Sequence, residues 1–155
     1  MFRIQTDATK RAGVLEPDEA ALIQHVLDFE TVTAANLMSP LRKVTAIPLD
    51  MPLETVLQLT SKTDYDQFPV MSASGDFVGQ VRVFEVLKSG KQEGGRVSDF
   101  IRSLVRVGPD EPAISVLHRL KKSRVELAVV VSKRGRPLGI ISSYDIVQEL
   151  MLGEG

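Results

Sequence analysis

Apolar and polar positions follow the same order twice along this 155-residue chain. In each stretch a short apolar strand is followed by an Asp-x-Pro sequence and then by apolar residues at helical spacing. Asp50 and Asp110 are good N-cap types and proline is tolerated in the first helical turn, so each Asp-x-Pro predicts a helix start. Two short strands around a glycine turn and a closing helix complete each stretch. The expected order is therefore β-α-β-β-α, with elements at 44–48, 53–60, 68–71, 77–81 and 83–88, and again at 104–107, 113–122, 127–131, 138–141 and 144–152.

A shift of 60 residues brings the two stretches into register without a gap. The identical pairs are Asp50 and Asp110, Pro52 and Pro112, Val56 and Val116, Leu57 and Leu117, Lys62 and Lys122, Val70 and Val130, Ser72 and Ser132, Gly75 and Gly135, and Gly79 and Gly139. One such unit has too little core to be stable alone, so two copies are expected to pack their sheets as a pseudo-twofold pair with two related clefts. The predicted fold class is α/β (α+β), divided into an N-terminal helical linker at 1–34, a first repeat at 35–93 and a second at 94–155.

Two helical segments precede the first repeat. Residues 16–29 carry an apolar stripe, and Pro17 with the acids that follow it suits the first turn of a helix. A second, shorter helix at 34–38 is expected to stop before Pro40. The stripe consists of Leu22, Ile23, Val26 and Leu27.

Composition excludes several classes of function. A net charge of −1 gives no pull toward nucleic acid, and the absence of cysteine excludes disulfides and thiolate chemistry. No apolar run approaches the ~20 residues that span a bilayer, so a soluble, cytoplasmic chain is expected. Residues 90–95 lack the spacing of a P-loop, and neither a Ser/His/acid set nor a metal motif can be assigned. We therefore expect a protein that is not an enzyme.

The most informative stretch for binding is 139–145. Ser142 and Asp145 stand where a predicted strand enters a helix, whose free N–H groups and positive dipole end can hold an anion. A hydroxyl can add a hydrogen bond to phosphate, and a carboxylate can accept both hydroxyls of a ribose. The same spacing also fits a capping box, in which Ser142 caps the helix and Asp145 reaches back to it. Both interpretations stay open from the sequence alone.

Two tandem β-α-β-β-α units, with Phe68-Pro69-Val70 on a second strand and a Gly139-led strand ending in Ser-x-x-Asp, resemble a CBS pair, or Bateman module. The segments 15–27 and 37–42 look like the lead-in to the CBS pair of CorC/HlyC-type (CNNM-like, hemolysin-related) proteins. Leu41 departs from that pattern, because the family commonly continues from Met-x-Pro directly into arginine. The resemblance implies the cytosolic sensor portion of a membrane ion transport protein, whose transmembrane domain is absent from this chain.

The resemblance also implies the ligand and its site. An adenine nucleotide (AMP or ATP, with or without Mg²⁺) would bind crosswise, with the Asp145 junction of one repeat facing the first and second strands of the other. The carboxylate would hold the ribose, and Arg42 at the cleft mouth would meet phosphate. Ordinary core packing is the alternative for the apolar members. The expected nucleotide-binding residues are Arg42, Val44, Thr45, Ala46, Gln67, Phe68, Pro69, Ile140, Ser142, Tyr144 and Asp145.

The sister junction at 79–85 has lost these features. Arg82 replaces the hydroxyl and Glu85 replaces the aspartate, and the two are expected to form a salt bridge with each other. One nucleotide site is therefore predicted. The resemblance further implies a homodimer formed through the CBS helices. The alternative function is a dimerisation scaffold that binds no nucleotide.

Overall fold

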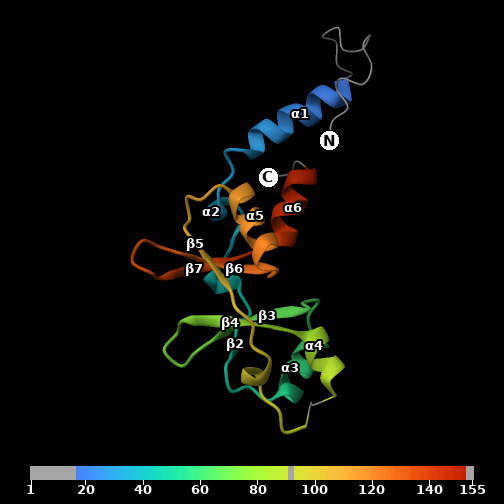
Figure 1. Cartoon of the computed structure of the whole chain (residues 1–155), viewed down its shortest axis with the longest axis vertical. Coiled ribbons are helices and arrows are strands. Elements are labelled where there is room, and N and C mark those ends of the chain that lie inside the picture. Colours follow the sequence, from blue (N-terminus) through green and yellow to red (C-terminus); the bar gives the residue numbers. More distant parts are fainter. Residues whose placement is uncertain (1–16, 91–92, 153–155) are drawn as a thin grey trace.

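The computed structural model describes residues 17–90 and 93–152 and builds both repeats from the same elements (Figure 1). The first repeat contains β2 (Ile47–Pro48), α3 (Leu53–Thr60), β3 (Gln67–Met71), β4 (Phe77–Arg82) and α4 (Val83–Ser89). The second contains β5 (Val105–Val107), α5 (Ala113–Ser123), β6 (Leu127–Val131), β7 (Pro137–Ser142) and α6 (Ser143–Leu152). β3 and β6 begin and end 60 residues apart, and so do β4 and β7. The predicted β-α-β-β-α duplication is confirmed.

Each repeat forms one sheet that is covered on one face by its own two helices (Figure 1). In the first repeat β2 runs parallel to β3, and β3 pairs antiparallel with β4. In the second repeat β5, β6 and β7 repeat this arrangement. Separate clusters of buried apolar residues lie under the helices of each repeat. A third cluster joins the repeats between their sheets and consists of Phe77, Leu127, Val129 and Ile140.

The segments that lead into the repeats are exchanged between them. β1 (Ser39–Pro40), which precedes the first repeat, pairs antiparallel with β7 of the second. Arg102, which precedes the second repeat, bridges Gln80 on β4 of the first. The short helices α2 (Ala34–Leu37) and η2 (Val97–Phe100) accompany these crossings, and each packs into the core of the other repeat. Each repeat is thus completed by the lead-in of its partner.

This exchange also corrects the predicted helix starts. The N-cap residues of α3 and α5 are Pro52 and Pro112, so the expected capping by Asp50 and Asp110 is wrong. The first N–H groups of the two helices instead donate to carbonyl oxygens of the crossing segments, at 3.0 Å for Leu53 and 2.8 Å for Ala113. These are groups that a capping side chain would otherwise satisfy. The crossing chain makes that cap unnecessary.

Helix α1 (Pro17–Phe29) lies beyond the helices of the second repeat, at the end of the molecule away from the first repeat (Figure 1). Its Phe29 is buried, and the His25 ring donates from Nε2 to the Glu149 carbonyl of α6 at 3.0 Å. Most of its predicted apolar stripe is solvent-exposed, because α1 contacts the repeat along one edge only. Leu15 and Glu16 of the family-like lead-in lie outside the described residues. Within the described ranges, no helix has the length and apolar character that crossing a membrane requires.

Candidate functional site

The Ser142–Asp145 junction has the geometry of half a capping box. The Asp145 backbone N–H donates to Ser142 Oγ at 3.0 Å, so the serine caps α6. The reciprocal contact is absent, because the backbone of Ser142 lies in the β6–β7 ladder opposite Leu127. Within the described part of the chain, the Asp145 carboxylate forms no hydrogen bond or ion pair, and its residue is only partly exposed. A carboxylate is therefore available beside a capped helix N-terminus.

The structure brings part of the predicted opposing wall to this junction. Val44 and Ala46 pack against the cluster between the sheets, which contains Ile140 at 7% exposure. The η1 turn (Leu41–Lys43) lies against β7 and carries Arg42, which is exposed and unpaired among the described residues. Thr45 is partly exposed between them. These residues come from the first repeat and face β7 of the second, as the crosswise arrangement requires.

The second-strand residues are placed differently. Phe68 has 0% exposure and lies in the core of the first repeat, so the expectation that its ring covers an adenine is wrong. Alternate residues of a strand face opposite sides, and Phe68 shares the core side with Val70. Pro69 is buried on the other face, and Gln67 is half-buried at the start of the strand. These two stay on the side of the sheet that faces the other repeat.

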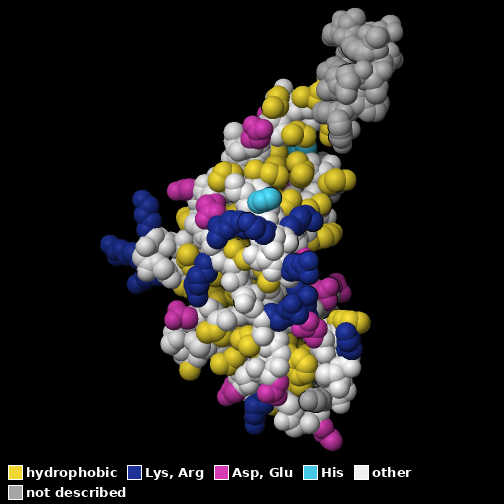
Figure 2. All heavy atoms as spheres, viewed as in Figure 1, with side chains coloured by type: hydrophobic (Ala, Val, Ile, Leu, Met, Phe, Trp, Pro, Cys, Tyr) yellow, Lys and Arg dark blue, Asp and Glu magenta, His cyan; other side chains and the backbone are white. Residues whose placement is uncertain are grey.

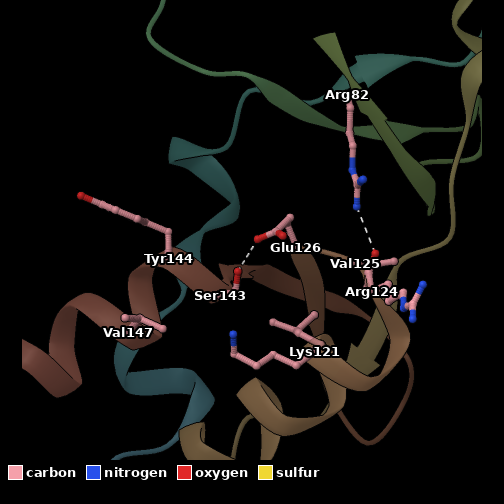
Figure 3. Close-up of a pocket in the computed structure, with 9 residues that line it drawn as sticks. Arg82, Lys121, Arg124, Val125, Glu126, Ser143, Tyr144 and Val147 are labelled. Atoms are coloured by element: carbon pink, nitrogen blue, oxygen red, sulfur yellow. Dashed lines mark hydrogen bonds between the residues drawn. The ribbon is translucent and has the colours of Figure 1, made fainter. Parts of the chain in front are cut away.

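Tyr144 does not join this group. Its ring is 67% exposed, and its hydroxyl accepts from Gln148 on the next turn of α6 at 3.2 Å. Neighbouring residues on a helix point about 100° apart, so Tyr144 and Asp145 face different directions. Tyr144 lies instead at the rim of a separate cavity (Figure 3).

The sister junction in the first repeat is closed by an ion pair. Glu85 pairs with Arg102 at 2.5 Å, so the predicted Arg82–Glu85 salt bridge is wrong. The exchanged lead-in places Arg102 opposite Gln80, within reach of Glu85. Arg82 donates instead to the carbonyl of Arg124 at 3.1 Å. The acid of this junction is thereby neutralised, whereas Asp145 has no such partner.

Two cavities lie next to residues of the sister junction or their partners. One of about 600 Å³ is lined by Arg82, Leu120, Lys121, Arg124, Val125, Glu126, Ser143, Tyr144 and Val147. Another of about 470 Å³ is lined by Ile101, Arg102, Ser103, Leu104, Val105, Ser123 and Val125. Neither is lined by Ser142 or Asp145.

The internal repeat identifies one residue that sequence reasoning missed. Leu104, Val105 and Val125 line the 470 Å³ cavity, and their counterparts 60 residues earlier are Val44, Thr45 and Tyr65. Tyr65 is 49% exposed and meets Phe68 edge-on, with ring centroids 5.9 Å apart. The 60-residue register was the signal that could have found it. Tyr65 therefore presents an exposed aromatic ring at the position that corresponds to Val125 in the lining of that cavity.

A duplicated β-α-β-β-α unit with exchanged lead-in segments and a serine–aspartate junction has the architecture of a Bateman module. The model of the CBS domain matches residues 34–91 and 97–152, and the chain belongs to the CBS-domain family. The predicted resemblance to the CBS pairs of CorC/HlyC-type proteins is also confirmed by similar solved structures.

Three relatives illustrate the similarity. The CBS domain of a bacterial CNNM/CorC family Mg²⁺ transporter in complex with ATP is 26% identical, with a TM-score of 0.79 over 86% of this chain and 97% of that one. A structure of the CBS domain of the bacterial CNNM/CorC family Mg²⁺ transporter, with no ligand named, is 25% identical, with a TM-score of 0.82 over 95% and 91%. UPF0053 protein YrkA of Bacillus subtilis is 22% identical over 97% of this chain, which spans 36% of that relative's length.

Proposed function

We propose that this CBS pair is a regulatory module that binds one adenine nucleotide at the Asp145 junction. The observation that carries the proposal is the contrast between the two junctions. Ser142 caps α6, and the Asp145 carboxylate has no partner in the part of the chain that the structure describes, whereas Glu85 in the sister position is bound by Arg102. A half-buried carboxylate without a partner is unfavourable in the folded chain unless a ligand or water satisfies it.

The surrounding residues fit a nucleotide. The carboxylate of Asp145 can accept both ribose hydroxyls, and the N-terminal end of α6 together with Arg42 can attract phosphate. Val44 and Tyr65 offer apolar surface for an adenine, and Thr45 adds polar groups at its edge. Among the described residues no cluster of His, Asp or Glu is placed to hold a metal ion. In this proposal any Mg²⁺ would arrive with the polyphosphate.

ATP is the first nucleotide to test, because a structurally similar CBS domain at 26% identity was solved in complex with ATP. Isothermal titration with ATP and AMP should give one site per chain. Asp145→Asn should weaken binding at least tenfold, because a charge-assisted hydrogen bond contributes roughly 1.5–3 kcal/mol.

The matched control is Glu85→Gln, which alters the corresponding acid of the other repeat and should leave nucleotide affinity unchanged. If neither nucleotide binds at millimolar concentration, or if both variants weaken binding equally, the proposed site is wrong. A nucleotide that binds and is then hydrolysed would contradict a purely regulatory role.

We further propose that the module is the cytosolic sensor part of a membrane transporter of the CorC/CNNM type. The support is its similarity to CBS domains of Mg²⁺ transporters and its coverage of about a third of the curated relatives. Fusing the chain to the membrane domain of such a relative and measuring Mg²⁺ flux with and without ATP tests this role. A flux that ignores Asp145→Asn would contradict it.

The outer helices favour a homodimer. Phe84 and Leu87 on α4 are 70% and 53% exposed, and their counterparts Tyr144 and Val147 on α6 are 67% and 36% exposed. Apolar residues at matching positions of both repeats form a face suited to a second copy. Light scattering should report a dimer that Leu87→Glu dissociates, whereas Val78→Glu on a strand should not. A dimer that binds no nucleotide would favour the scaffold alternative.

A further inference from the structure

The 600 Å³ cavity carries a concentration of positive charge at the junction of the repeats (Figure 3). Its lining contains three cations, Arg82, Lys121 and Arg124, and one carboxylate, Glu126. Lys and Arg side chains also gather across the middle of the molecule, where the repeats meet (Figure 2). A concave surface with an excess of cations raises the local concentration of anions.

Arg82 is the one member that the first repeat contributes. It extends from the end of β4 toward the turn before β6, where one terminal nitrogen donates to the Arg124 carbonyl (Figure 3). Its Nε is buried and has no hydrogen-bond partner among the described residues. A buried guanidinium nitrogen without an acceptor is unfavourable, and an anion in the cavity would supply that acceptor.

The shared fold does not require these cations. In the 60-residue register, Ser142 of the second repeat corresponds to Arg82, and Ser61 and Asp64 of the first repeat correspond to Lys121 and Arg124. Both repeats form the same elements, although these three counterpart positions are neutral or acidic. The shared elements therefore form without this positive charge, which needs a cause other than folding.

Arg124 is a second cation of this cavity whose presence folding does not explain. It is the C-cap of α5 in the left-handed conformation, with φ of 58°, where glycine is the favoured residue. An arginine at this position is tolerated against its backbone preference. This makes Arg124→Gly a useful variant, because it removes the charge while relieving the backbone.

The remaining lining limits what can bind. Ser143 donates a hydrogen bond from its hydroxyl to the Glu126 carboxylate. Glu126 is the only negatively charged residue in the lining of this cavity. Leu120, Val125 and Val147 supply apolar surface, and the exposed Tyr144 stands at the rim. The volume lies within the range of small-molecule sites, roughly 300–1,000 Å³.

We propose that this cavity is a second binding site, distinct from the Asp145 junction, which takes a polyphosphate group of a small molecule. Arg82 from the first repeat and Lys121 and Arg124 from the second would hold the phosphates together. A ligand bound in this way would tie the end of β4 to the beginning of β6 and so hold the repeats at one angle.

Titration with inorganic tripolyphosphate at low ionic strength tests the site, because this probe has neither base nor ribose for the Asp145 junction. The chain should bind it, and Arg82→Gln and Lys121→Gln should each weaken binding about tenfold. Glu126→Gln should tighten binding, because it removes the opposing charge. Arg124→Gly should weaken binding while the melting temperature holds or rises.

Surface controls separate this site from general charge, and a comparison with Arg42→Gln separates it from the proposed nucleotide site. Lys122→Gln alters an exposed neighbour outside the lining and should leave binding unchanged, as should Arg134→Gln in the turn between β6 and β7. Equal weakening by Lys121→Gln and Lys122→Gln would overturn the proposal, as would binding that Arg42→Gln abolishes and Arg82→Gln leaves intact. Absence of tripolyphosphate binding at millimolar concentration would also overturn it, while ATP binding sensitive to Asp145→Asn would still stand.

Discussion

Replacement of Gly139 by alanine tests the exchange of lead-in segments on which the nucleotide site depends. Gly139 lies on β7 where β1 crosses it, and an added Cβ would stand 2.3 Å from the Ser39 carbonyl oxygen and 2.9 Å from Met38 Sδ. A relaxed carbon–oxygen contact is about 3.3 Å, so β1 must retreat by about 1 Å. The sulfur can move with its side chain, but the carbonyl belongs to the backbone of β1 and takes the whole strand with it.

The loss of stability in Gly139→Ala follows from the contacts that β1 loses when it moves. The strand pairs with β7 through Ser39 and Pro40 only, so a shift of this size weakens the whole β1 ladder. One or two lost ladder hydrogen bonds at about 1 kcal/mol each, together with looser packing of Met38, give about 2 kcal/mol. For a chain of this length that amounts to a fall of about 4–8 °C in melting temperature. Thermal unfolding followed by circular dichroism measures it.

Two further glycines serve as controls. Gly108→Ala should be neutral or slightly stabilising, because the new Cβ meets only a carboxylate oxygen at 3.9 Å. Gly79→Ala should destabilise the chain as Gly139→Ala does, since its Cβ would stand 2.5 Å from the Arg102 carbonyl. ATP affinity should fall in Gly139→Ala alone, because β1 leads directly into the turn that carries Arg42. If Gly139→Ala and Gly108→Ala have the same melting temperature, the close contact between β1 and β7 is refuted. If Gly79→Ala and Gly139→Ala have the same ATP affinity, the link between that contact and the nucleotide site is refuted.

Three other substitutions are expected to have separable effects. Ser142→Ala removes the cap on the Asp145 N–H and should cost about 1 kcal/mol of stability, measurable by denaturant unfolding, in addition to weakening nucleotide binding. His25→Ala removes the contact of α1 with the end of α6 and should speed proteolysis within 17–29 without lowering the main unfolding transition by more than about 1 kcal/mol. Phe68→Leu should cost about 1–1.5 kcal/mol as a core substitution yet leave ATP affinity unchanged in titration; a selective loss of affinity would contradict its burial in the core.

The periodic part of the fold could be predicted from the sequence because each element carries its own repeated signal. The 60-residue register located both units, and β3, β4, β6 and β7 keep it in the structure. The first strand is an exception, because the prediction of a strand at 44–48 is wrong for 44–46 and β2 begins at Ile47. The exchange of lead-ins has no such signal, since β1 is two residues long and pairs about 100 residues away. Only the identical glycines at 79 and 139 mark the two crossings, and a glycine in a strand can equally mark a bulge or a tight bend.

Part of the candidate site could be predicted from the sequence, because that part depends on local chain geometry. Ser142 and Asp145 follow from local chain geometry at a strand–helix junction, which sequence spacing records. Phe68 was misplaced because residues 67–69 were treated as one wall, although alternate strand residues face opposite sides. The partner of Glu85 was missed because Arg102 reaches it through the exchanged segment. Residues brought together by long-range crossing were the ones that local patterns could not supply.

The differences between the repeats are more informative about function than their identities. The identical residues form turns and cores, and these would be retained in any stable pair. At the junctions the repeats diverge in charge and hydrogen bonding: Ser142 stands opposite Arg82 in the register, and the unpaired Asp145 opposite the ion-paired Glu85. Since the same backbone forms in both halves, folding alone cannot account for this divergence. Unequal ligands at the two junctions would account for it, and they would give one side a sugar-binding acid and the other a set of phosphate-binding cations.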